Sequence, residues 1–250
     1  MSSLVALILG AGPNVGYHVA KTLQSQRYKV ALGSCNPDVD ALKKEGLFPV
    51  KVDVTLPDSV SAAYKTSLHS ARYPQRSGVQ WCILIHRLCV SNTDLLTAAV
   101  WRFLKVEADP LSLPLEDFKR TLAVTTSVYS VAQDALKGFR SLTSGPKTFI
   151  VTGNILPFLS HDNTILYDLQ TLKVVEAHLI EVFYNAYIKE DIRFHFALLI
   201  SPEGGIPAYS GFLKSGPAHA KVYWELISSK EPKGWDYRFA IDGKEWSKVN

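Results

Sequence analysis

The sequence predicts an α/β fold: a single domain over residues 1–250, built on a doubly wound parallel sheet of about seven strands with helices on both faces. Three observations predict it. Short apolar runs of strand length alternate with longer stretches of helical periodicity, which is the pattern of parallel strands joined by helical crossovers. The first apolar run leads directly into a glycine-rich turn. Finally, 250 residues with 47% hydrophobic side chains suit one large domain with an ample core.

The first element is the one around which the fold is organised. Residues 4–9 are all apolar, which indicates a strand buried on both faces of a parallel sheet. The glycine-rich residues 10–16 follow, and helical spacing begins at Tyr17. This order aims free N–H groups and the positive end of a helix at a phosphate, and glycine lets the backbone approach it closely. The turn therefore predicts nucleotide-binding residues, namely Gly10, Gly12, Asn14, Val15 and Gly16.

The remaining elements alternate along the chain. Helix starts are marked by Asn36-Pro37-Asp38 and by Pro57-Asp58-Ser59. Further strands are expected at 29–34, 48–52, 79–85, 148–152, 194–200 and 237–241. Further helices are expected at 39–45, 57–69, 95–105, 115–142, 165–188 and 218–228. Between the sixth strand and the last helix, the glycine- and proline-rich residues 201–217 are expected to form a lid over a substrate pocket.

Composition excludes several classes of function. A net charge of +4 without a lysine and arginine stripe argues against a nucleic-acid partner. No apolar run approaches the roughly 20 residues of a membrane span, and no signal peptide precedes the first strand. The three cysteines, Cys35, Cys82 and Cys89, are odd in number and lack metal-ligand spacing. Neither a disulfide framework nor a metal site is therefore expected, and the cytoplasm is the expected location.

The glycine turn occurs together with further motifs in a fixed order, and the ordered set resembles the short-chain dehydrogenase/reductase family over nearly the whole chain. The resemblance implies a Rossmann-type fold, a nicotinamide cofactor and a homodimer or homotetramer formed through the two long helices. It also implies that Asp53 and Val54 hold the adenine. The motifs that carry it, besides Gly10, Gly12 and Gly16, are Asp53-Val54, the helix in 114–135, the strand and helix in 148–173, Ser201-Pro202-Glu203-Gly204-Gly205 and Asp242-Gly243.

The family's catalytic tyrosine and lysine lie four residues apart, which puts both side chains on one helix face. This chain offers Tyr167 and Lys173, which are six residues apart and so about 240° apart around a helix. If Lys173 is the family lysine, Leu169 occupies the tyrosine position. If Tyr167 is the family tyrosine, Thr171 occupies the lysine position. The first register is preferred, because residues 174–187 then continue the family's helix.

Other matched positions are also substituted. Asn154 stands at the serine position, Thr125 at the asparagine position and Asn14 at the second glycine of the turn. His86-Arg87-Leu88 replaces the segment Asn-Ala-Gly that follows the fourth strand, at the end of the sheet where such folds bind ligands. The candidate catalytic residues are therefore Lys173, Tyr167, Asn154, His86, Arg87 and Thr125.

Cofactor choice depends on the end of the second strand. An acidic residue there would select NAD and an arginine would hold the phosphate of NADP, but the chain has Ser34, Cys35 and Asn36. Ser34 and Asn36 can hydrogen-bond a 2′-phosphate, so NADP(H) is expected before NAD(H), with no cofactor at all as the third alternative. Lys173 is expected to hold the nicotinamide ribose as well as to act in catalysis.

Three functions follow from these substitutions. The first is a repurposed enzyme of this fold that isomerises or cyclises a small hydrophobic metabolite without redox chemistry. The second is an NADP(H)-dependent carbonyl reductase with an unusual set of catalytic residues. The third is a non-catalytic protein that binds a nucleotide or another ligand. Removing a general acid lowers a rate by roughly 10²–10⁴, so the first is ranked above the second and the third is ranked last.

Overall fold

The computed structural model describes residues 4–70, 80–85, 109–160 and 166–247. Its strands are β1 (Leu4–Leu9), β2 (Lys29–Ser34), β3 (Phe48–Lys51), β4 (Gln80–Ile85), β5 (Lys147–Gly153), β6 (Ile192–Leu199) and β7 (Asp236–Phe239). Its helices are α1 (Val15–Ser25), α2 (Val39–Lys44), α3 (Pro57–Ser70), α5 (Leu115–Arg140), α6 (Tyr167–Tyr187), α7 (Tyr209–Leu213) and α8 (Gly216–Ser228). Short 3-10 turns are η1 (Pro110–Ser112), η2 (Leu156–Phe158) and η4 (Ile188–Glu190).

The strands form one seven-stranded sheet in the order β3-β2-β1-β4-β5-β6-β7. Every pairing between neighbouring strands is parallel. The chain first builds outward from β1 to β3 and then returns to build the other half from β4 to β7, so the order reverses between β1 and β4. In open α/β sheets a ligand binds at such a reversal, beyond the carboxyl ends of the strands.

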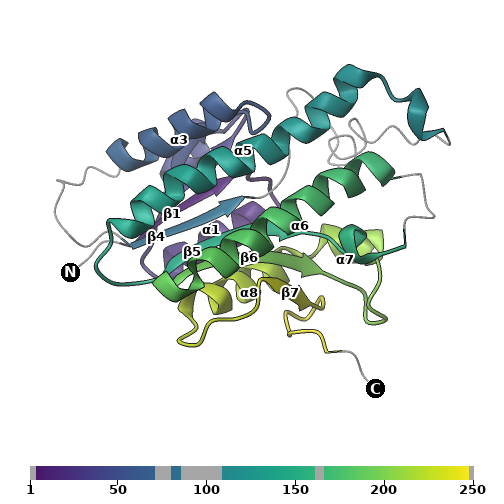
Figure 1. Cartoon of the computed structure of the whole chain (residues 1–250). Coiled ribbons are helices and arrows are strands. Elements are labelled where there is room, and N and C mark those ends of the chain that lie inside the picture. The colour runs from purple at the N-terminus through teal and green to yellow at the C-terminus, as the bar shows by residue number, and fades with distance from the viewer. Residues whose placement is uncertain (1–3, 71–79, 86–108, 161–165, 248–250) are drawn as a thin grey trace.

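Helices cover both faces of the sheet (Figure 1). On one face, α3, α5 and α6 enclose a core that includes Val60, Val131, Phe149 and Ile180. On the other face, α1 and α8 pack against each other and against the sheet around Val19 and other apolar side chains. Side chains alternate along a strand between the two cores, which is why the central strand β1 is apolar at every position.

The predicted α/β class and the order of the elements are confirmed within the described residues. The predicted helix at 95–105 lies outside them. Residues 201–217 contain a short helix, α7, that the glycine- and proline-rich composition did not predict, and their opening as a lid stays a prediction. Among the described residues, no helix combines the length and apolar character that crossing a membrane requires.

Candidate active site

The glycine turn at the carboxyl end of β1 has the tight geometry that its sequence requires. Gly10 has a positive φ of 72°, which favours glycine. The Ala11 amide donates to the Gly33 carbonyl at 2.8 Å, so the turn stays attached to β2. A Cβ on Gly16 would lie 2.7 Å from the Ala11 Cα, so only glycine lets α1 begin this close to the turn. The Asn14 side chain does not cap α1, because it bonds elsewhere.

The end of β2 carries the residues expected to select the cofactor. Ser34 is partly buried and Asn36 is exposed, while Asp38 caps α2 by accepting from the Ala41 amide at 3.0 Å. Cys35 is disulfide-bonded, so the expectation that the cysteines form no disulfide is wrong at this position.

A cation that sequence reasoning missed lies beside Ser34. Lys51, the last residue of β3, is in register with Ser34 and is exposed. Its strand neighbours Val50 and Val52 belong to the core under α3, α5 and α6, so Lys51 points to the opposite face. Leu32 packs on that same opposite face, and Ser34 lies two residues after it in β2, so the Ser34 side chain points to that face as well. The register therefore puts an ammonium group and a hydroxyl on one side of the sheet edge.

Asp53 and Val54 follow β3. One Asp53 carboxylate oxygen accepts from the Thr55 amide at 2.9 Å and from the Thr55 hydroxyl at 2.7 Å, and the Asp53 amide donates to the Ser59 hydroxyl at 3.0 Å. Val54 is buried in the core. These bonds fix the direction of the carboxylate at the edge of the sheet, where the resemblance expects an adenine.

Lys173 lies on α6 and reaches back to the carboxyl end of β5. Its Nζ donates to the Thr152 carbonyl at 3.1 Å and to Glu176 Oε2 at 2.7 Å. The side chains of Lys173 and Glu176 are 17% and 2% exposed, so a nearly buried carboxylate neutralises the lysine. Sequence reasoning missed Glu176, because a glutamate three residues after a lysine resembles an ordinary surface pair on a helix.

The helix between Tyr167 and Lys173 is regular, which settles what lies one turn before the lysine. α6 begins at Tyr167, and four residues separate Leu169 from Lys173. Leu169 is therefore on the face of Lys173, whereas Tyr167 lies in the first turn on another face. The Thr171 hydroxyl donates to the Tyr167 carbonyl at 2.7 Å, as a helix-facing threonine does.

Asp168 is a second titratable group that sequence reasoning passed over. It is 1% exposed, and burial raises the pKa of its carboxyl, an effect partly opposed by the hydrogen bond from the Leu169 amide. Its Oδ2 has no hydrogen-bond partner within the part of the chain that the structure describes. This carboxyl lies on the same helix as Lys173, at a position about 140° around the helix from it.

Asn154 directly follows β5, and Thr125 lies on α5. Asn154 Oδ1 accepts from the Leu156 amide at 3.1 Å, which leaves its NH2 group as the donor. Thr125 is buried on α5, and its hydroxyl finds no partner among the described residues. Buried hydroxyls are normally paired, so an unpaired one marks a place for a water or a ligand oxygen. His86 and Arg87 lie outside the described residues.

A phenol on the other face of β5 is not a substitute for the family tyrosine. The Tyr223 hydroxyl shares a hydrogen bond of 2.6 Å with the Thr152 hydroxyl. Burial raises the pKa of Tyr223, and the bond to Thr152 opposes this only in part. Tyr223 is 1% exposed within the core between α8 and the sheet, so it ties α8 to β5.

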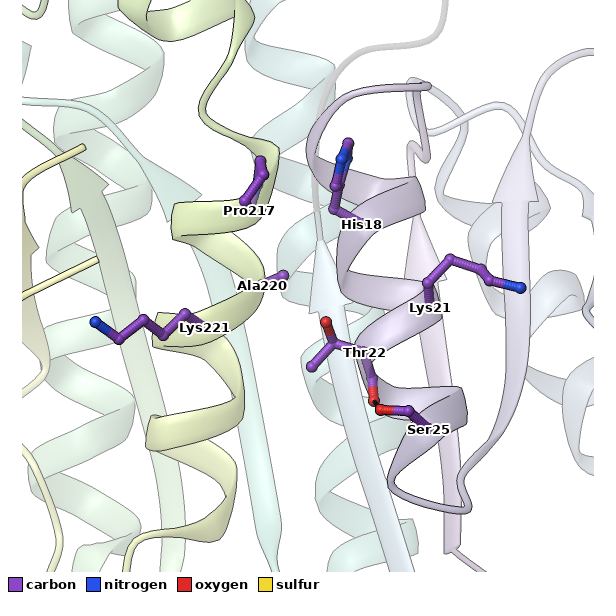
Figure 2. Close-up of a pocket in the computed structure, with 7 residues that line it drawn as sticks. All are labelled: His18, Lys21, Thr22, Ser25, Pro217, Ala220 and Lys221. Carbon is purple, nitrogen blue, oxygen red and sulfur yellow. Dashed lines mark hydrogen bonds between the residues drawn. The ribbon is translucent and has the colours of Figure 1, made fainter. Parts of the chain in front are cut away.

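An open groove of about 470 Å³ lies between α1 and α8 on the outer surface of their layer. Figure 2 shows side chains of both helices along it, with Lys21 and Thr22 on α1 and Lys221 on α8. The groove is separate from Lys173 and Glu176, because these two residues lie on α6, which covers the opposite face of the sheet. The described residues contain no group of three or more His, Cys, Asp or Glu side chains that could hold a metal ion.

A parallel sheet that reverses its strand order beside a glycine turn defines the class of doubly wound, dinucleotide-binding-type α/β proteins. Comparison with known proteins narrows that class. The chain is 30% identical over 241 residues to the short chain dehydrogenase/reductase dmxR12 of Cryptosporiopsis sp. (strain 8999), covering 94% of this chain and 91% of that protein. The chain therefore belongs to the short-chain dehydrogenase/reductase family. No protein-family model matches it.

Solved structures share the fold at low sequence identity. The TT0495 protein from Thermus thermophilus has a TM-score of 0.68 at 16% identity, with 96% of this chain and 98% of that chain covered. A short-chain type dehydrogenase/reductase from Mycobacterium marinum has a TM-score of 0.66 at 18% identity, with 97% and 95% covered. A short-chain dehydrogenase from Rhodopseudomonas palustris has a TM-score of 0.62 at 16% identity, with 94% and 97% covered.

Proposed function

We propose that this member of the family acts on a small apolar substrate by acid/base chemistry and polarisation, as an isomerase or cyclase, without net hydride transfer. One observation carries the proposal. Leu169, which has no proton to give, lies one helical turn before Lys173, and Lys173 is itself held by the buried Glu176. In the family a phenol beside that lysine exchanges a proton with the substrate oxygen, and losing a general acid lowers a rate by roughly 10²–10⁴.

The remaining polar groups suit polarisation better than proton delivery during reduction. The Lys173 ammonium, fixed by Thr152 and Glu176, is a donor to a developing oxyanion, and the Asn154 NH2 group is a second one. The Thr125 hydroxyl, which has no partner among the described residues, is proposed to hold a water. Tyr167 and His86 stay proposed proton carriers, and Arg87 stays a proposed donor to an anion or oxyanion. These groups would hold a carbonyl substrate in place while its α-proton is transferred to another atom of the substrate, or while a ring bond forms.

The residues at the turn fit a dinucleotide. Gly10 and Gly16 let the backbone approach closely, and the first turn of α1 has no side-chain cap competing for its amides. We propose that Gly12, Val15 and Gly16 hold the pyrophosphate, Asp53 and Val54 the adenine, and Ser34, Asn36 and Lys51 a 2′-phosphate. NADP(H) is thus the proposed cofactor, ahead of NAD(H). A bound nicotinamide would supply a hydride donor or acceptor.

Carbonyl reduction with NADP(H) is the second candidate, and it rests on two retained features. The turn keeps the geometry of a nucleotide site, and Lys173 keeps its place at the end of β5. For this reaction Tyr167 or a water held by Thr125 would have to supply the proton that Leu169 cannot.

One experiment separates the two candidates. The protein is titrated with NADPH and NADH by calorimetry and then incubated with NADPH and a panel of cyclic enones, ketones and aldehydes, with products followed by mass spectrometry. Products of unchanged mass without NADPH consumption support the acid/base proposal. Products heavier by two hydrogens, with equal loss of NADPH, overturn it in favour of the reductase.

We further propose that two copies pair through α5 and α6, which lie side by side on one face (Figure 1). Val174, Val175 and Val182 on α6 and Tyr129 on α5 are exposed apolar side chains on these helices. Wild type is expected to sediment as a dimer or tetramer at micromolar concentration and Val182→Glu as a monomer. A monomeric wild type would contradict this pairing.

A further inference from the structure

Asn14, in the glycine turn, joins two parts of the molecule that are far apart in sequence. Its Nδ2 donates to the Phe212 carbonyl at the end of α7 at 2.9 Å. Its Oδ1 accepts from the Gly216 amide at the start of α8 at 2.8 Å. The side chain thus uses both functions of its amide group to connect the turn to the end of the 201–217 segment.

The surroundings of these two bonds leave little freedom. The Phe212 carbonyl also accepts from the Ser215 hydroxyl at 2.7 Å, and Ser215 is fully buried. A Cβ on Gly216 would lie 2.7 Å from Asn14 Oδ1 and 2.5 Å from His18 Nδ1, so the start of α8 fits against α1 only as glycine. Figure 2 shows His18 and Pro217 at the adjoining ends of these helices.

His18, on α1, also contacts Asn14. Its Nδ1 lies 2.7 Å from the Asn14 carbonyl, and because a carbonyl only accepts, Nδ1 carries the proton. The Asn14 backbone is therefore held by α1 while its side chain holds α7 and α8. No other uncharged side chain of similar size offers a donor and an acceptor at this spacing, and glycine, alanine or aspartate would each lose at least one bond.

We propose that Asn14 is a positioning residue that makes the nucleotide turn and the α7–α8 junction one rigid body. The short helix α7 then moves with the turn instead of moving independently of it. An anion bound at the turn stabilises the junction, and by linkage a ligand held under α7 stabilises the turn equally. The coupling between a bound ligand and the junction rests on the proposed nucleotide site. The connection through the two side-chain hydrogen bonds of Asn14, which we call the clamp, does not.

The clamp is tested first without ligand, by hydrogen exchange of the intact protein. Asn14→Ala is expected to speed exchange at the Gly216 amide and across residues 209–216 by about 3- to 10-fold, the loss of one or two hydrogen bonds. Asn14→Asp keeps the acceptor for Gly216 but loses the donor to Phe212, so exchange should rise in α7 and less at Gly216. Ser25→Ala removes the hydroxyl that bonds the Thr22 carbonyl on the same helix and is the matched control. Unchanged exchange at 209–216 in Asn14→Ala overturns the proposal.

The coupling is tested by adding NADPH, and separately inorganic pyrophosphate, to the same variants. In wild type both residues 10–16 and residues 209–216 should exchange more slowly, whereas in Asn14→Ala only residues 10–16 should. Equal slowing of 209–216 in Asn14→Ala overturns the coupling. If neither probe slows exchange at 10–16 in wild type, the nucleotide site fails, while the ligand-free comparison still decides for or against the clamp.

Discussion

Leu169→Tyr tests most directly whether Leu169 occupies the position of the family's catalytic tyrosine. It puts a phenol four residues before Lys173, which on a regular α6 means a rotation of about 40° and a rise of about 6 Å between the two Cα atoms. Both side chains then lie on one face, within reach of the same substrate oxygen. Leu169 is only partly buried, so the larger ring meets open space on one side.

The expected gain is the contribution of one general acid. A positioned acid contributes roughly 10²–10⁴ in rate, which is about 3–5 kcal/mol of barrier. Leu169→Tyr should therefore reduce a simple ketone with NADPH at least about 100-fold faster than Leu169→Phe, which adds the ring without the hydroxyl. The measurement is loss of nicotinamide absorbance under saturating NADPH, with product confirmed by mass.

Two controls make the result interpretable. Leu169→Tyr combined with Lys173→Met and Glu176→Gln should lose the gain, because the phenol then lacks its cationic neighbour and no unpaired buried carboxylate remains. Equal NADPH affinity in Leu169→Phe and Leu169→Tyr, measured by calorimetry, shows that only chemistry differs. If Leu169→Tyr binds NADPH and is no faster than Leu169→Phe, the preferred register, with Lys173 as the family lysine, is refuted.

The other predictions concern stability and cofactor choice. Lys173→Met should destabilise the protein by about 3–5 kcal/mol in urea unfolding, because it leaves the buried Glu176 carboxylate unpaired, and the double change with Glu176→Gln should recover much of this; a loss below 1 kcal/mol would contradict the buried pair. Burial lowers the pKa of His195 and of His219 to about 4, from an ordinary value near 6.5. Between about pH 6.5 and pH 4 these two histidines are protonated in the unfolded chain but neutral in the native state. The free energy of unfolding is therefore highest above about pH 6.5 and falls toward pH 4, by up to about 1.4 kcal/mol per pH unit for each histidine. His195→Gln should flatten that slope in denaturation curves, and an unchanged slope would argue against a neutral buried imidazole. Lys51→Ala should weaken NADPH binding about 10-fold and leave NADH binding nearly unchanged, because only NADPH carries the 2′-phosphate; equal losses would place Lys51 elsewhere.

The sequence was informative where one residue type has one physical use. Residues 4–9 are apolar on both faces, and only a central parallel strand accounts for that, so β1 and its turn could be predicted with their boundaries. The long periodic stretches of α5 and α6 were equally clear. α7 was missed because it is five residues long and has no side-chain cap, within a segment whose glycines and prolines favour loops.

The site was harder to predict, because its decisive contacts join distant or differently placed residues. Lys51 becomes a candidate only once the register of β2 and β3 puts it beside Ser34. Glu176 looks like a surface charge until the packing of α6 on the sheet buries it. The bonds of Asn14 span 198 and 202 residues, and no local pattern in the sequence encodes them.

The Lys173–Glu176 pair has a consequence for what reaches the cleft from solution. A cation that carries its own counterion projects little field beyond its immediate contacts, so it does not draw carboxylates or phosphates inward from a distance. Lys173 should therefore contribute little to the attraction of a charged substrate, and the part of the association rate that depends on Lys173 should stay nearly flat as the ionic strength of the medium is raised.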